Sequence, residues 1–122
     1  MASNVLIVDD QANVRGIVRA FLETVHGCAV VEATDGLDAV ARLAAAEFDL
    51  VISDLVMPRM TGLELLGHIR RDRKRRALPV VLLTSQGDEK ERRKAQALGV
   101  SAYLLKPFDP KALQPLLERL LP

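Results

Sequence analysis

The stretch Asp49-Leu50-Val51-Ile52-Ser53-Asp54-Leu55-Val56-Met57-Pro58 joins a short apolar run to a carboxylate at its end. A continuous apolar run of this length is typical of a parallel strand that is buried on both faces of a sheet. Open α/β sheets bind their ligands at the loops that follow the strands. We therefore expect Asp54 to lie at the ligand-binding edge of a parallel sheet.

Apolar runs of the same character alternate with amphipathic segments along the chain. The predicted strands are residues 5–8, 29–33, 49–54, 79–84 and 101–105, and the predicted helices are 14–25, 36–46, 62–69, 88–98 and 110–120. Helices between successive strands favour a parallel sheet that is covered on both faces through right-handed crossovers. We expect one α/β domain over residues 1–122, a doubly wound five-stranded (βα)5 sheet of the flavodoxin-like order 2-1-3-4-5.

Several helix ends have recognisable capping sequences. Thr61 and Glu64 have the spacing of a capping box, in which both side chains satisfy free amides at the start of a helix. Asp109 followed by Pro110 is typical of an N-cap with proline at the first helical position. Pro115 lacks an amide hydrogen inside the last helix, so we expect that helix to start irregularly.

The apolar residues of each helix predict the face that packs on the sheet. The first helix has a stripe at helical spacing that consists of Val14, Ile17, Val18, Phe21, Leu22 and Val25. The second helix is built on Leu37, Val40 and Leu43. Helix 88–98 has essentially only Ala95 and Leu98 on its apolar face, so we expect it to be the least firmly packed helix.

Composition and charge exclude several classes of protein. Hydrophobic residues make up 49% of the chain and charged residues 27%, which is the balance of a globular domain. The formal net charge of +1 gives no overall attraction to nucleic acid or membrane. The apolar runs are too short to cross a bilayer and the N-terminus has no basic signal region, so we expect a soluble, cytoplasmic protein. The single cysteine, Cys28, lies in an apolar stretch and is expected to be a buried thiol.

Polar residues stand at the ends of four predicted strands. Strand 5–8 is followed by Asp9 and Asp10, and strand 49–54 ends in Asp54. Strand 79–84 ends in Thr84, and strand 101–105 is followed by Lys106. Parallel strands end at the same edge of a sheet, so these side chains are expected to converge on one crevice. The first loop has no glycine-rich turn, which disfavours a dinucleotide-binding sheet.

The chemistry of these residues is suited to phosphoryl transfer. Three carboxylates in one crevice repel one another and call for a divalent cation. Mg²⁺ prefers oxygen ligands and commonly binds one or two carboxylates together with a phosphoryl oxygen. The Thr84 hydroxyl and the Lys106 ammonium are the donors that a phosphoryl group needs around it. No general base accompanies them, because His26 and His68 lie on predicted helices far in sequence from the strand ends.

In this combination the chain closely resembles the CheY-like receiver domain of two-component response regulators. The resemblance covers essentially the whole chain and rests on Asp9-Asp10, Asp54 with Met57-Pro58 and Gly62, Thr84, and Lys106-Pro107. It implies that Asp54 is the phosphoacceptor, which receives a phosphoryl group from a sensor histidine kinase or a phosphotransfer protein. It also implies that the chain catalyses only its own Mg²⁺-dependent phosphorylation and dephosphorylation, and is not an enzyme for other substrates.

The resemblance implies the remaining roles as well. Mg²⁺ would be held by Asp9, Asp10, Asp54 and the main-chain carbonyl of Val56. Lys106 would contact the phosphoryl group, Thr84 would move toward it, and Tyr103 would swing inward behind Thr84. The Lys106–Pro107 peptide bond is typically cis in the family.

An output surface is also implied by the resemblance. Helix 88–98, strand 101–105 and the last helix would change shape and be read by an output partner or domain, or by a second copy of the chain in a homodimer. No direct nucleic-acid or membrane binding is expected of this domain. Phosphate lifetime in the family depends partly on the positions held here by Val56 and Gln86, and the apolar Val56 predicts slow-to-moderate self-hydrolysis.

Other functions fit parts of the sequence. A receiver-like module that binds partners regardless of phosphorylation would keep the same fold. An aspartate-nucleophile phosphatase would need a cap insertion, which the chain lacks. Both a stand-alone regulator and a receiver within a longer protein fit the sequence. The basic run Arg70–Arg76 fits a solvated helix end, docking of an acidic partner, or weak nucleic-acid contact, although no aromatic platform accompanies it.

Overall fold

The computed structural model describes residues 2–85 and 89–122. Its elements in chain order are β1 (Asn4–Val8), α1 (Ala12–His26), β2 (Ala29–Ala33), α2 (Gly36–Ala45), β3 (Leu50–Asp54), α3 (Gly62–Arg71), β4 (Val80–Thr84), α4 (Glu89–Ala97), β5 (Ala102–Leu105), the 3₁₀ helix η1 (Pro110–Leu113) and α5 (Gln114–Leu120). Within the described ranges, five parallel strands form one sheet in the order β2-β1-β3-β4-β5. The predicted fold class and strand order are confirmed.

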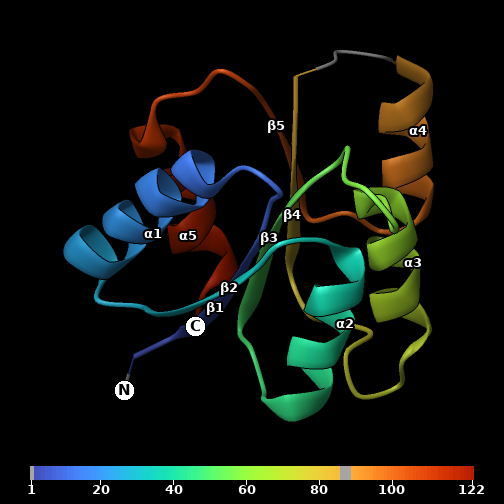
Figure 1. Ribbon diagram of the computed structural model, residues 1–122, viewed down its shortest axis with the longest axis horizontal. Coiled ribbons are helices and arrows are strands. Elements are labelled where there is room, and N and C mark those ends of the chain that lie inside the picture. The colour runs from blue at the N-terminus through green and yellow to red at the C-terminus, as the bar shows by residue number, and fades with distance from the viewer. Residues whose placement is uncertain (1, 86–88) are drawn as a thin grey trace.

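Helices cover both faces of the sheet (Figure 1), with α1 and α5 on one side and α2, α3 and α4 on the other. Successive residues of a strand point to opposite faces, so the central strands contribute to two separate cores. Ile7 and Ile52 pack with α1 and α5, whereas Leu6 and Val51 pack with α2 and α3. This burial on both faces is the physical reason that β1, β3 and β4 have continuous apolar sequences.

The helix faces that pack on the sheet are narrower than the sequence predicts. On α1, Val18 and Leu22 are buried, but Ile17 is 56% exposed and Val25 is 52% exposed. On α2, Leu43 is buried and Val40 is half-buried as predicted, but Leu37 is exposed, and Gly36 and Ala39 are buried in addition. A helix that lies on a sheet buries one stripe, so apolar residues at the margin of the stripe stay in contact with water.

The capping sequences behave as predicted. Thr61 and Glu64 form the capping box at the start of α3. The Asp109 side chain caps η1, and α5 begins only at Gln114 with Pro115 in its first turn, where the missing amide costs no helical hydrogen bond. Cys28 is buried. No helix among the described residues combines the length and the apolar character that crossing a membrane requires.

The prediction of a thinly packed helix 88–98 is confirmed for α4. Ala95 is the one residue of α4 that is fully buried, and the other residues of this helix are largely polar. Gly99, with a positive φ of 81°, follows the helix. The start of the predicted helix at Asp88 lies outside the described residues.

Candidate active site

Three carboxylates come together at the carboxyl edge of the sheet. β1 lies beside β3 in the sheet, so Asp9 and Asp10 after β1 meet Asp54 at the end of β3. One oxygen from each of these carboxylates lies within 4.8 Å of the others. Asp9 and Asp54 are buried and Asp10 is exposed, so the cluster opens to solvent on one side.

Lys106 lies between the two buried carboxylates. Its Nζ is 3.1 Å from Asp9 Oδ2 and 3.5 Å from Asp54 Oδ1. The lysine follows β5, and its main-chain amide donates to the carbonyl of Thr84 at 2.6 Å. The Lys106–Pro107 peptide bond is cis, as expected. One ammonium therefore offsets part of the negative charge that β1 and β3 bring to this edge.

The pKa of Asp54 is raised above its ordinary value. Burial is the largest cause, and the neighbouring Asp9 carboxylate adds to it. Lys106 and a hydrogen bond from the Val56 main-chain amide act in the opposite direction, but they do not cancel the effect. The protein alone thus compensates the charge of Asp54 incompletely, and a cation or a cationic ligand at the cluster would complete the compensation.

Thr84 and Tyr103 lie on the same face of the sheet. In the register of β4 and β5, Leu82 pairs with Tyr103 and Thr84 pairs with Leu105, so the Thr84 and Tyr103 side chains both point toward the α2–α4 side. Thr84 is buried. Tyr103 packs against the core on this side, and its hydroxyl is buried with no hydrogen-bond partner among the residues that the structure describes.

The loop after β3 is held close to the sheet by Gly62. The Gly62 amide donates to the carbonyl of Leu55 at 2.8 Å. A Cβ atom at Gly62 would lie 2.5 Å from the Asp54 carbonyl oxygen and 2.9 Å from Leu55 Cα, so glycine is required for this close approach. Within the loop, Val56 is 60% exposed although it is a large apolar residue. Gln86, the other position expected to affect phosphate lifetime, lies outside the described residues.

Comparison with known proteins decides the family. Residues 5–118 match the family model of the response regulator receiver domain. The chain belongs to this family. Over 116 residues it is 36% identical to the chemotaxis protein CheY-3 of Vibrio cholerae, and the match covers 95% of the chain and 89% of CheY-3. It is also 36% identical over 109 residues to the transcriptional regulatory protein ResD of Bacillus subtilis. That match covers 89% of this chain but only 44% of ResD.

Solved structures of receivers have the same fold. The structure of CheY4 of Vibrio cholerae superposes with a TM-score of 0.92 at 35% identity, over 99% of this chain and 100% of CheY4. The receiver domain of the sensor histidine kinase PA1611 of Pseudomonas aeruginosa superposes with a TM-score of 0.88 at 27% identity, over 98% of both chains. That structure has a magnesium ion coordinated in its active-site cleft. Receiver domains are signalling domains of two-component systems, and the acidic cluster of this receiver has the oxygen ligands that Mg²⁺ prefers.

Two arginine contacts support the site of this receiver and were not predicted. Arg59, in the left-handed region at a φ of 70°, donates from Nε to Asp35 Oδ2 at 3.0 Å and so ties the loop after β3 to the start of α2. Arg15 donates to the main-chain carbonyl of Asp9 at 2.7 Å and to Glu32 at 2.8 Å. The Arg59–Asp35 and Arg15–Glu32 contacts join residues from different βα units, and no local sequence pattern indicates such pairs.

Proposed function

We propose that Asp54 accepts a phosphoryl group from a phosphohistidine of a sensor histidine kinase or a phosphotransfer protein. The observation that carries this proposal is the position of Lys106, whose ammonium lies 3.1 Å from Asp9 and 3.5 Å from Asp54. An ammonium in that place is suited to contact an oxygen of a group that has been added to Asp54. The described residues around this cluster include no histidine that would act as a general base for a separate substrate.

The proposed transfer needs no general base on this chain. A carboxylate oxygen of Asp54, already anionic, attacks the phosphorus, and the new O–P bond forms as the N–P bond of the phosphohistidine breaks. The electron pair of that bond returns to the imidazole nitrogen. Hydrolysis restores the carboxylate, because water supplies the oxygen that leaves with inorganic phosphate. Asp54 is thus both the nucleophile and the group that stores the signal.

Mg²⁺ would be held by Asp9, Asp10, Asp54 and the main-chain carbonyl of Val56. The raised pKa of Asp54 supports a cation here, since burial and the Asp9 carboxylate disfavour the charged form. When bound, the ion would neutralise charge on the phosphoryl oxygens during the transfer. Lys106 would contact a further phosphoryl oxygen.

A switch toward the α4-β5-α5 surface is the proposed output. Thr84 and Tyr103 lie on the face of the sheet that α2, α3 and α4 cover, so movement of Thr84 toward a phosphoryl group changes the space beside Tyr103. The Tyr103 hydroxyl has no hydrogen-bond partner among the described residues that would hold the ring in place. Only Ala95 anchors α4 fully in the core, which favours a low cost for its movement.

The proposal is tested by measuring the intact mass of the protein after incubation with a small-molecule phosphodonor. We expect a gain of one phosphoryl group with Mg²⁺ and no gain when EDTA removes the metal. Peptide mapping should locate the group on Asp54. An unchanged mass in the presence of Mg²⁺, or a phosphoryl group on another residue, would contradict the proposed function.

Exposed apolar side chains beside the site suit the docking of the phosphodonor protein. A groove of about 390 Å³ lies between the start of α1 and the segment after β5, next to Lys106. Val14, Ile17, Pro107 and Phe108 line it. Ile17 is 56% exposed although it is a large apolar residue. A donor protein that brings its phosphohistidine to Asp54 has to cover this edge of the sheet, and the groove offers it apolar contact area.

Replacement of Ile17 by aspartate is expected to slow transfer from a phosphorylated histidine phosphotransfer domain by about tenfold, the effect of losing one well-packed apolar contact. The rate with a small phosphodonor should not change, because Ile17 does not touch the carboxylates. Val25→Asp is the matched control, since Val25 is 52% exposed at the other end of the same helix. Equal transfer rates for the two variants would contradict the docking assignment.

A further inference from the structure

The near-neutral net charge of the chain conceals a strongly basic segment. Residues 70–94 contain ten lysine and arginine residues and four acidic residues, a net charge of +6, whereas the rest of the chain has a net charge of −5. The cations lie at the end of α3, in the loop that follows it, and along α4. This distribution attracts acidic partners to the side of the molecule where α3 and α4 lie.

Two cations of this segment have a structural role. Arg70 donates to the carbonyls of Gly99 and Leu78, at 2.8 Å and 2.7 Å for its closest contacts. Arg75 donates to the Asp72 side chain and to the carbonyl of Leu43. The remaining cations have exposed side chains: Arg71, Arg73, Lys74, Arg76, Lys90, Arg92, Arg93 and Lys94. Two of them form ion pairs along α4, Arg93 with Glu89 and Lys94 with Glu91, each at 3.7 Å, and the exposed cations outnumber these acidic partners.

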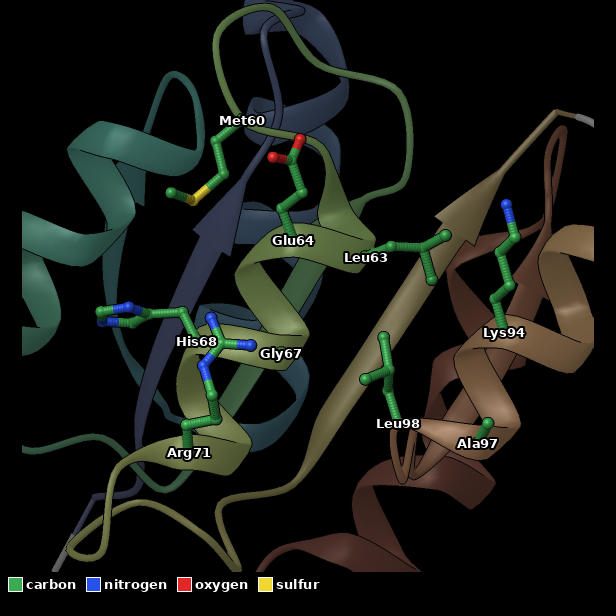
Figure 2. A pocket seen from close by; sticks show the side chains of 9 residues that line it. All are labelled: Met60, Leu63, Glu64, Gly67, His68, Arg71, Lys94, Ala97 and Leu98. Atoms are coloured by element: carbon green, nitrogen blue, oxygen red, sulfur yellow. The ribbon is translucent and has the colours of Figure 1, made fainter.

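Between α3 and α4 this surface is hollowed by a groove of about 560 Å³. Figure 2 shows the Leu63 and Leu98 side chains pointing toward one another across it, with Gly67 between them on the α3 side. Arg71 and Lys94 lie at its margins. The groove is open because Gly67 has no side chain and because Ala95 alone anchors α4 fully in the core.

We propose that this groove docks an acidic amphipathic helix of a partner protein. Helices bind to grooves through apolar side chains spaced by three or four residues, and Leu63 and Leu98 provide an apolar floor for such side chains. Acidic residues on the flanks of the bound helix would meet Arg71 and Lys94. Glu64, the one acidic residue of the lining, accepts a hydrogen bond from the Thr61 amide in the capping box, at the end of the groove nearest Met60.

Other partners of the basic surface fit the groove less well. Single-stranded nucleic acid binds to basic surfaces through stacking on aromatic side chains, and the lining contains no Phe, Tyr or Trp. A membrane surface binds to an apolar helix face that projects outward, whereas the apolar residues here lie at the floor of a groove between two helices. The proposal involves neither Asp54 nor the β5 side of α4, so it goes beyond the switch.

The first test is fluorescence anisotropy with a labelled synthetic peptide of about 18 residues, which is five turns of helix. The peptide has leucine at helical spacing on one face and glutamate on the other. We expect it to bind with micromolar affinity, and we expect at least about tenfold weaker binding of two matched peptides, one with lysine for glutamate and one with the leucine spacing scrambled. Equal affinities for the three peptides would overturn the proposal.

A plug in the groove gives the decisive comparison. A Cβ at Gly67 would meet only the Arg71 guanidinium at 3.2 Å and Leu98 at 3.9 Å, so Gly67→Leu is expected to fold and to fill the groove. Gly16→Leu is the matched control, because Gly16 is also a helical glycine and a Cβ there meets nothing within 4 Å. We expect at least about tenfold weaker peptide binding for Gly67→Leu and unchanged binding for Gly16→Leu.

A second pair of variants tests the charged margin without changing the apolar floor. Arg71→Gln with Lys94→Gln should weaken binding of the acidic peptide, whereas Arg42→Gln with Lys111→Gln removes the same charge elsewhere and should not. Duplex DNA and vesicles with anionic lipid are the competing probes. The proposal would be overturned if the wild type bound DNA or vesicles but not the acidic peptide, and if Gly67→Leu left that binding unchanged.

Discussion

An Asp54→Asn protein is expected to take up no phosphoryl group and to unfold at a higher urea concentration than the wild type in metal-free buffer at neutral pH. Asparagine keeps the shape of the side chain but lacks the anionic oxygen that attacks phosphorus. It also removes a buried charge beside Asp9 that, among the described residues, Lys106 and the Val56 main-chain amide compensate in part. Loss of function and gain of stability therefore have the same physical cause.

The pH dependence of this gain follows from the raised pKa of Asp54. A carboxyl group whose pKa is higher in the folded state binds its proton more tightly there. The free energy of unfolding of the wild type therefore falls as the pH rises from the unfolded-state pKa, about 4, through the folded-state pKa, and it stays lower above that range. The Asp54→Asn protein lacks this contribution, so the stability difference should grow with pH and then level off.

Urea unfolding of both proteins in EDTA across this pH range measures the difference. Glu47→Gln, which removes an acidic charge from an exposed position, is the control and should show no such curve. Addition of Mg²⁺ should stabilise the wild type more than Asp54→Asn, because a ligand that binds only the folded state shifts the equilibrium by mass action. A variant that is less stable than the wild type throughout would contradict this account of the site.

Replacement of Gly62 by alanine is expected to destabilise the protein by about 2–3 kcal/mol, toward the upper end of the usual cost of overpacking. The added Cβ would lie 2.5 Å from the Asp54 carbonyl oxygen and 2.9 Å from Leu55 Cα. Both are backbone atoms of the site, and they cannot turn away as a side chain can. The end of β3 has to shift, so binding of Mg²⁺ should weaken as well.

Gly67→Ala on the same helix is the matched control and should have the opposite sign. Its Cβ comes closest to the flexible end of Arg71, at 3.2 Å, and meets Leu98 at an ordinary 3.9 Å, and alanine in place of glycine stabilises a helix interior by about 0.5–1 kcal/mol. Urea unfolding measures both changes, and a magnesium titration measures the effect on the site. Similar destabilisation by the two substitutions would show that helix packing in general, rather than the contact with Asp54 and Leu55, limits position 62.

Local patterns in the sequence were enough to predict the fold and to locate the carboxylate cluster. The apolar runs and the helices between them favour a doubly wound parallel sheet, and in such a sheet every strand end lies at one edge. Asp9 and Asp54 follow adjacent strands and therefore meet at this edge. Lys106 follows β5, on the far side of β4, and reaches both carboxylates through its long side chain. The capping box at Thr61 and the irregular start of the last helix near Pro115 are equally local, and both predictions are confirmed.

Contacts between units that are distant in sequence were decided only by the tertiary structure. The exposure of Ile17 depends on how α1 lies on the sheet, not on the spacing of its apolar residues. The contact of Arg59 with Asp35 depends on two loops that lie together in the fold although the two residues are 24 positions apart in sequence. Likewise the groove between α3 and α4 exists because Gly67 of α3 lies opposite Leu98, which directly follows α4. Sequence periodicity indicates which residues avoid water, but only packing determines which surfaces remain for partners.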